Sequence, residues 1–103
     1  MSTPASASRP RQLGIPPIPS ADPSSFEVAR IWMSGGNQHV ALAVNEADDP
    51  AAWGIMLADL ARHVANAYSQ FGTHSKEDAM HRVLALFAAE LQRPTDRPTG
   101  QIQ

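Results

Sequence analysis

Four polar side chains near the middle of the chain have the types and spacing of a small reactive cluster. Asp59 and His63 lie four residues apart, so a helix would place them on one side together with Arg62 and Asn66. A histidine that acts as a general base needs an orienting carboxylate of this kind. The nearest hydroxyl, on Ser69, lacks the glycine-rich elbow of hydrolases. Since i, i+4 pairs also stabilise ordinary helix surfaces by about 0.2–0.5 kcal/mol, we predict a candidate ligand-binding cluster and no catalytic residue.

A second set, His74, Glu77 and His81, has the residue types of a metal site. Glu77 and His81 would share one helix face and could both reach one ion. Zinc proteases instead place two histidines at that spacing with a glutamate between them, and this order is missing here. We interpret the three residues as an exposed helix surface. The sequence therefore predicts no metal site and no cofactor.

The polar cluster belongs to a segment, residues 48–72, that has the pattern of one long helix. Asp49 can cap its start and Pro50 suits the first helical position, whereas Gly72 can end it in a left-handed conformation. Between these signals, apolar residues recur every three or four positions, which is typical of one buried stripe. The stripe consists of Trp53, Leu57, Leu60, Val64, Tyr68 and Phe71.

A second helix is predicted to begin after Ser75, which forms a capping box with Asp78, and to end near Gln92 before Pro94. Its apolar positions are Met80, Val83 or Leu84, Phe87 and Leu91. Because the connection between the two helices is short, we expect them to lie roughly antiparallel.

Ahead of the helices, residues 26–33 and 38–44 are rich in strand formers and flank Gly35 and Gly36, which can form a two-residue primed turn. This hairpin would set Ser34 opposite Asn37 and Trp32 opposite His39. One face, with Ala29, Ile31, Met33, Val40, Leu42 and Val44, is expected to be covered by the helices. The opposite face carries the predicted interface residues, which are Phe26, Val28, Arg30, Trp32 and His39.

That second face is too apolar for an ordinary solvated surface, and a two-stranded hairpin is only marginally stable alone. A second copy of the chain is the simplest source of cover, so we expect a homodimer. Pairing could occur edge to edge or through the Trp32 face, and an unidentified protein partner is the other possibility.

The composition defines the rest of the organisation. Six of the nine prolines lie in residues 1–25, and R-P-T occurs twice after residue 92, so we predict disordered tails at 1–25 and 93–103 around one domain at 26–92. Ile15 and Ile18 could still cover exposed sheet.

The charge and hydropathy of the domain exclude some classes of partner. The domain holds four basic against eight acidic residues, which disfavours nucleic-acid binding. No apolar run is long enough for a membrane span, and with no cysteine and no leader pattern we expect a soluble, cytoplasmic protein.

Three blocks resemble a known family: E-V-A-R-I-W at residues 27–32, G-G-N-Q-H-V-A-L at 35–42, and W-G-x-x-L-x-D-x-A-R-H-x-A-x-A-Y at 53–68. It is a family of small bacterial proteins defined only as a domain of unknown function, and the match spans about residues 27–91. The resemblance implies a small free-standing domain with no assigned reaction, cofactor or catalytic residue.

Together these observations predict an α+β fold, in which an antiparallel hairpin is followed by two antiparallel helices packed on one sheet face. The leading functional hypothesis is a non-enzymatic protein-interaction or self-associating module. The alternative is a small-molecule-binding domain or weak enzyme that uses Asp59 and His63 between the hairpin and the helices.

Overall fold

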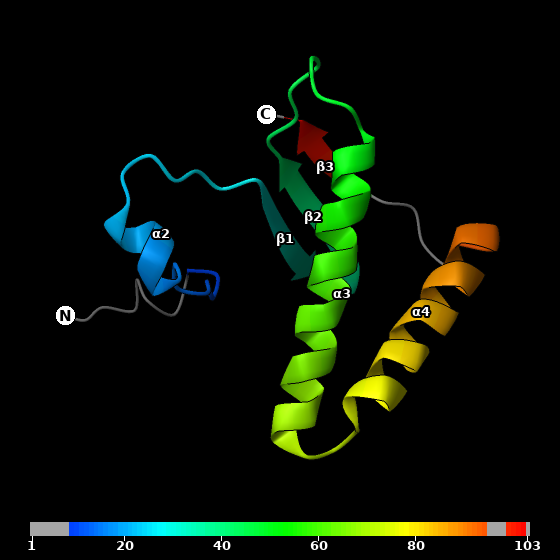
Figure 1. Cartoon of the computed structure of the whole chain (residues 1–103). Coiled ribbons are helices and arrows are strands. Elements are labelled where there is room, and N and C mark those ends of the chain that lie inside the picture. Colours follow the sequence, from blue (N-terminus) through cyan, green and yellow to red (C-terminus); the bar gives the residue numbers. More distant parts are fainter. Residues whose placement is uncertain (1–8, 95–98, 103) are drawn as a thin grey trace.

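The computed structural model of the protein describes residues 9–94 and 99–102. In chain order the elements are helix α2 (Pro17–Ala21), strands β1 (Ala29–Ser34) and β2 (Asn37–Leu42), helices α3 (Ala51–Phe71) and α4 (Lys76–Gln92), and strand β3 (Thr99–Ile102) (Figure 1). The predicted α+β class, with an antiparallel hairpin followed by helices, is confirmed.

The hairpin has the predicted register. Ser34 lies opposite Asn37, Trp32 lies opposite His39, and the two strands are antiparallel. Gly35 and Gly36 take φ angles of 60° and 81°, which side chains other than glycine rarely adopt. The turn residues therefore fix which side chains share each face of the sheet.

Helix α3 begins and ends at its sequence signals. The Asp49 carboxylate accepts a hydrogen bond of 2.9 Å from the backbone N–H of Ala51, and this satisfies one of the donors left open at a helix start. The helical hydrogen-bond pattern itself begins at Ala51, one residue later than Pro50, where we expected the first helical position. At the other end Gly72 is left-handed, with φ of 80°.

Helix α4 is capped as predicted, because the Ser75 hydroxyl accepts a hydrogen bond of 3.0 Å from the backbone N–H of Asp78. The Asp78 carboxylate lies 2.9 Å from the Nε atom of Arg82, one turn further along the helix. The capping box therefore supplies its serine half to the helix end, while its acidic residue forms an ion pair along the helix.

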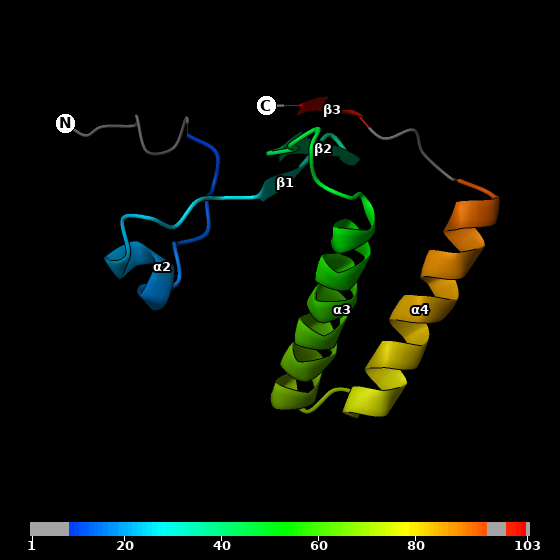
Figure 2. The same cartoon turned by 45° about the horizontal axis from the view of Figure 1, so that its top comes forward.

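The two long helices form a V that is closed at their connecting loop (Figures 1 and 2). Ala65 and Ala79 lie near this closed end, and they are the buried hydrophobic residues of the part that the structure describes. Large side chains toward the other end remain exposed: 47% for Leu60, 51% for Phe87 and 71% for Leu91. We call this second region the open end and define it by Leu57, Leu60, Leu86, Phe87 and Leu91.

The helices follow the hairpin as predicted, and α3 forms a second layer beside the sheet without a close backbone approach. Among the described elements, Cα atoms approach within 8 Å between β1 and β2, between β2 and β3, and between α3 and α4. Helix α3 crosses in front of the sheet in Figure 1, and the turned view in Figure 2 separates them as two layers. Ile31 and Met33, on the face predicted to be covered, are 54% and 68% exposed. The helix pair therefore leaves these two side chains largely exposed, while Ala29, Val40 and Leu42 on the same face are half-buried.

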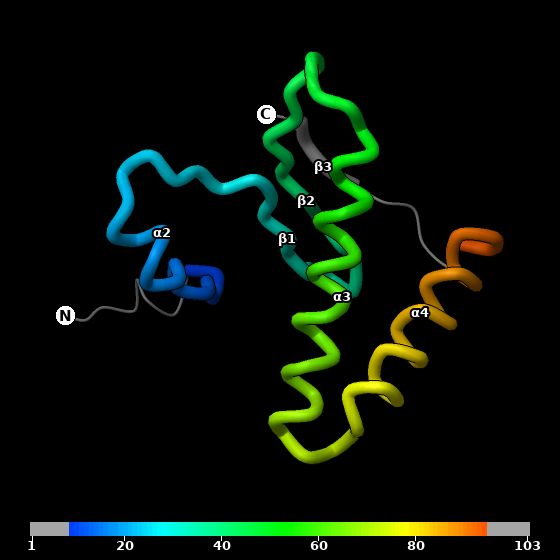
Figure 3. Tube along the Cα trace, viewed as in Figure 1, coloured from blue at the N-terminus to red at the C-terminus, as the bar shows by residue number. Residues whose placement is uncertain are grey.

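Two elements lie in segments for which the sequence predicts no order. The short helix α2 stands apart from the sheet at the end of an extended connection, as the chain trace shows (Figure 3). Strand β3 pairs in parallel with β2 and adds a third strand, so the order in the sheet is β1-β2-β3. These two elements do not test the predicted domain limits of 26–92, which stay a prediction.

The chain is less compact than a folded monomer of its mass. Its accessible surface is 9117 Å², whereas a folded monomer of 11.1 kDa exposes roughly 5,700 Å². Its Cα radius of gyration is 16.7 Å, against about 13 Å for a compact domain of this length. In the described part of the chain, no helix is both long and apolar enough to cross a membrane.

Candidate functional site

The predicted ligand-binding cluster lies on the open surface of α3. Arg62 donates a hydrogen bond of 2.8 Å from Nη1 to the Oδ1 atom of Asp59, and both side chains are largely exposed. The Asp59 carboxylate therefore orients Arg62 and not His63. His63 is itself exposed, and Asn66 is half-buried. This arrangement is that of an exposed i, i+3 ion pair, which contributes at most about 1 kcal/mol to stability.

The hollows seen in the described part of the structure lie elsewhere. One lies beside β1, and another follows α4 along Asp78, His81 and Leu86. Neither is lined by Asp59, Arg62, His63 or Asn66. A role for the cluster in ligand binding stays a prediction, and no contact in the structure adds to it.

The three residues with metal-ligand chemistry do not converge. His74 sits in the α3–α4 loop, with its ring edge against the Tyr68 ring at a centroid distance of 5.6 Å. Glu77 and His81 are exposed on α4. Across residues 9–94 and 99–102, no group of three or more histidine, cysteine, aspartate or glutamate side chains could hold a metal ion.

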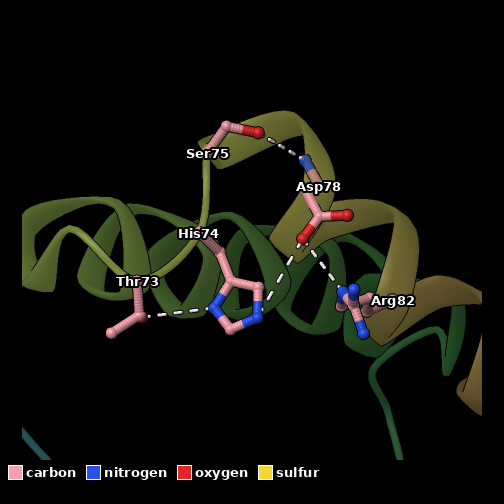
Figure 4. A network of polar contacts seen from close by, with 5 residues as sticks. All are labelled: Thr73, His74, Ser75, Asp78 and Arg82. Carbon is pink, nitrogen blue, oxygen red and sulfur yellow. Dashed lines mark hydrogen bonds and ion pairs between the residues drawn. The ribbon is translucent and has the colours of Figure 1, made fainter.

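Instead, His74 belongs to a polar network that ties the loop to α4 (Figure 4). Its Nδ1 atom lies 3.2 Å from the Thr73 hydroxyl, and its Nε2 atom lies 4.0 Å from the Asp78 carboxylate. The same carboxylate oxygen contacts Arg82, while Ser75 caps the helix. The network joins neighbours within ten residues of chain and stabilises the closed end of the V, and its Asp78 and Arg82 also line the hollow along α4.

The i, i+4 spacing of Asp78 and Arg82 is a sequence signal for the ion pair in this network. The capping-box pattern alone does not predict that ion pair. The position of His74 over Tyr68 had no such signal. It depends on how the chain turns after Gly72, which short-range spacing does not determine.

The predicted interface residues are partly brought together beside β1. Phe26 is 78% exposed at the start of the hairpin, whereas Val28 and Trp32 are half-buried. Arg30 pairs with Glu27 at 3.0 Å, and His39 lies exposed opposite Trp32. The structure thus offers an amphipathic surface at this edge of the sheet, as the pattern of alternate residues indicates.

A hollow of about 550 Å³ lies between this surface and the N-terminal segment. Phe26, Arg30 and Trp32 line one side of it, and residues 11–16 together with Pro19 line the other. The sequence did not predict that the N-terminal segment would lie here. The suggestion that Ile15 and Ile18 cover exposed sheet is not met, since both side chains remain exposed.

Comparisons with known proteins give a family and four matching solved chains. A family model described as a domain of unknown function (DUF5076) matches residues 12–95. A solved chain provisionally described as a pyruvate dehydrogenase from the photosynthetic bacterium Rhodopseudomonas palustrus is 34% identical, with a TM-score of 0.69. The alignment covers 89% of this chain and 94% of that chain. No curated protein matches the chain.

Proposed function

Because the chain belongs to the family described as Domain of unknown function (DUF5076), its role has to be argued from its own surface, and we propose a non-enzymatic, self-associating module. In this proposal a second copy of the chain completes the hydrophobic core, and the working form is a homodimer. The family match agrees with the resemblance carried by residues 27–91.

The observation that carries the proposal is the burial pattern. The described residues bury two alanines, whereas large apolar side chains on both long helices and on the hairpin stay exposed. Ordering a residue costs roughly 1–2 kcal/mol of backbone entropy, and apolar burial is the main term that offsets this cost. Two buried alanines and a set of half-buried side chains, among them Trp32, Trp53 and Val64, supply little of it, and a partner that covers the exposed apolar surface would add the rest.

The exposed area has the size that such a partner would require. The chain exposes 9117 Å², which exceeds the value for a compact monomer of its mass by roughly 3,400 Å². Obligate homodimer interfaces bury about 2,000–5,000 Å² in total, which is about 1,000–2,500 Å² on each partner. The excess of one chain is larger than this share, so the exposed surface has room for such an interface.

The description of the solved relative as a pyruvate dehydrogenase is not carried over to this chain. A site for a small charged substrate is built from enclosed polar side chains. Among the described residues of this chain, no polar or charged side chain is buried. We therefore base the proposal on the burial pattern and make no claim of catalysis.

The test is the solution mass by light scattering over a concentration series, for the wild type and two variants. Phe87→Glu places a charge in the open end, and Ala89→Glu places the same charge two residues away on the opposite side of α4. We expect a wild-type dimer that Phe87→Glu weakens at least tenfold and that Ala89→Glu leaves within about twofold. A wild type that stays monomeric at every concentration would overturn the proposal.

A further inference from the structure

The N-terminal segment carries three large apolar side chains that have no cover within the chain. We call residues 13–18 the arm. Leu13, Ile15 and Ile18 in the arm are 95%, 72% and 82% exposed. The family model begins at residue 12, so the arm falls inside the region that defines the family and outside the domain that hydrophobic periodicity predicts.

The arm is also partly stiffened. Pro16 precedes α2, Pro17 is its first residue, and the backbone N–H of Ser20 donates a hydrogen bond of 3.0 Å to the carbonyl of Pro16. Proline fixes φ, so a segment of this kind loses less conformational entropy when it binds than a flexible tail does. Exposed apolar residues on a stiffened segment are typical of a binding element.

We infer that the arm of one copy binds the open end of the helix pair of a second copy. This inference rests on the proposed self-association and names the contact that holds the two copies together. The arm offers alternating apolar side chains, and the open end offers Leu57, Leu60, Phe87 and their neighbours at exposures near one half or above. Both surfaces are apolar and exposed in the single chain, so contact between them would bury apolar area on each.

The arrangement in space favours exchange over closure within one chain. Figures 1 and 2 both place α2 and α4 on opposite sides of the sheet and α3. An arm that leaves from the β1 side would have to cross the whole molecule to reach its own α4. The arm of a second copy can approach α4 from outside, and two-fold symmetry then covers both open ends at once.

The charges agree with this pairing. Arg9 and Arg11 lie directly ahead of the arm, whereas Glu46, Asp48 and Asp49 lie just before α3, at the open end of the V. All five side chains are exposed in the single chain. Opposite charges beside an apolar contact set its orientation and its rate of association more than its affinity.

Cross-linking between two differently marked copies tests the exchange directly, because the chain has no cysteine of its own. One population carries Gly14→Cys, where an added Cβ meets nothing within 4 Å, and the other carries Ala88→Cys on α4. The two are mixed and treated with a short bismaleimide. The matched control replaces Ala88→Cys by Ser69→Cys, which is exposed near the closed end of α3.

We expect a covalent heterodimer between Gly14→Cys and Ala88→Cys, and at least a tenfold lower yield with Ser69→Cys. Equal yields, or a wild-type dimer without the cross-link, would overturn the arm exchange and leave the self-association intact. A monomeric wild type would overturn both. A Gly14→Cys/Ala88→Cys double variant that closes within one chain would show that the arm covers its own helices, which also contradicts the inference.

A charge exchange provides a second test that does not alter the apolar surface. Arg9→Glu with Arg11→Glu should raise the dimer dissociation constant about two- to fivefold at low salt, since exposed ion pairs contribute about 0.2–1 kcal/mol each. Adding Glu46→Arg and Asp48→Arg should restore the wild-type value. A loss that the second pair of substitutions fails to restore would contradict the pairing of these two clusters.

Discussion

The closed and open ends of the helix pair differ in where their contacts come from. At the closed end, Ala65 and Ala79 are buried, Ser75 caps α4, and His74 lies between Tyr68 and Asp78. These contacts join residues that are near one another in the chain. At the open end the large apolar side chains remain exposed, as Tyr68 and Phe71 do at the closed end, but no small residue that the structure describes there is buried between the helices. The comparison indicates that short-range contacts join the helices at the closed end, and that the open end is the part of the helix pair that the proposed self-association would cover.

The hairpin resembles the open end in this respect. Its hydrogen-bond register is complete, yet Ile31 and Met33 on one face are more than half exposed and Phe26 is exposed on the other. A correctly paired hairpin whose faces are only partly covered gains little stability from burial in water. The hairpin and the open end are therefore the two regions where a second copy would add most.

The largest expected effect comes from shortening a side chain at the open end. If a second copy covers Leu60, the change Leu60→Ala should lower the free energy of unfolding by about 2–4 kcal/mol, as at a buried leucine. Urea unfolding at a fixed protein concentration measures this. Arg62→Ala, two residues away in an exposed ion pair, is the control and should cost at most about 1 kcal/mol. A cost below about 1 kcal/mol for Leu60→Ala would mean that the open end stays solvated.

An intermediate effect is expected at the closed end. Ala65 has no exposed surface, so Ala65→Leu must push α3 and α4 apart and should cost about 1–3 kcal/mol. The same change at the exposed Ala58, two turns earlier, should cost far less. Thermal unfolding of the two variants side by side provides the comparison. Equal stability of the two would contradict the tight contact between the helices at this point.

The cap of α4 should contribute less again. Ser75→Ala removes the acceptor for the Asp78 backbone N–H and should cost about 1 kcal/mol. Ser75→Asp keeps an acceptor in place and adds a charge that the helix dipole favours, so its stability should stay close to that of the wild type. Chemical denaturation measures both variants, and an equal loss in the two would exclude capping as the cause.

The smallest effect concerns the turn after α2 and depends on pH. Hydrogen bonds from the Ser24 hydroxyl and backbone N–H hold the pKa of Asp22 below its usual value. Because the pKa is lowered in the folded chain, the ionised carboxylate stabilises the turn above the pKa of an unfolded aspartate, about 3.9. This contribution is lost as the pH falls through the folded pKa.

An NMR titration of the Ser24 amide signal should report the ionisation of the Asp22 carboxyl, with a midpoint below that of an aspartate in an unfolded chain. Asp22→Asn should abolish this titration of the Ser24 amide, because it removes the ionisable carboxylate that accepts both hydrogen bonds. A midpoint at or above the value of an unfolded aspartate would contradict the hydrogen bonds to Ser24.

Much of the fold could be predicted because its signals are short-range. Gly35 and Gly36 set the hairpin register, Gly72 ends α3, and Ser75 caps α4, and each of these depends on residues within one turn. The splay of the helices and the uncovered sheet could not be predicted. Apolar stripes show which side of an element seeks cover, but they do not show whether the cover comes from the same chain.

The pairing of strand β3 and the position of the arm could not be predicted from the sequence for a related reason. T-G-Q-I at residues 99–102 is too short and too polar to show strand periodicity, and its pairing with β2 is a long-range contact. The candidate cluster at Asp59 was correctly placed on a helix surface. Its geometry in the described part of the chain is that of an ion pair with Arg62, and a ligand for it stays a prediction.

The central claim is that folding and self-association are one process. The most direct test dilutes the wild type while solution mass and helical circular dichroism are measured on the same samples. We predict that the helical signal is lost over the same concentration range in which the dimer dissociates, because a single chain buries too little apolar surface to hold the helices together. A monomer that keeps the full helical signal after dissociation would contradict the account.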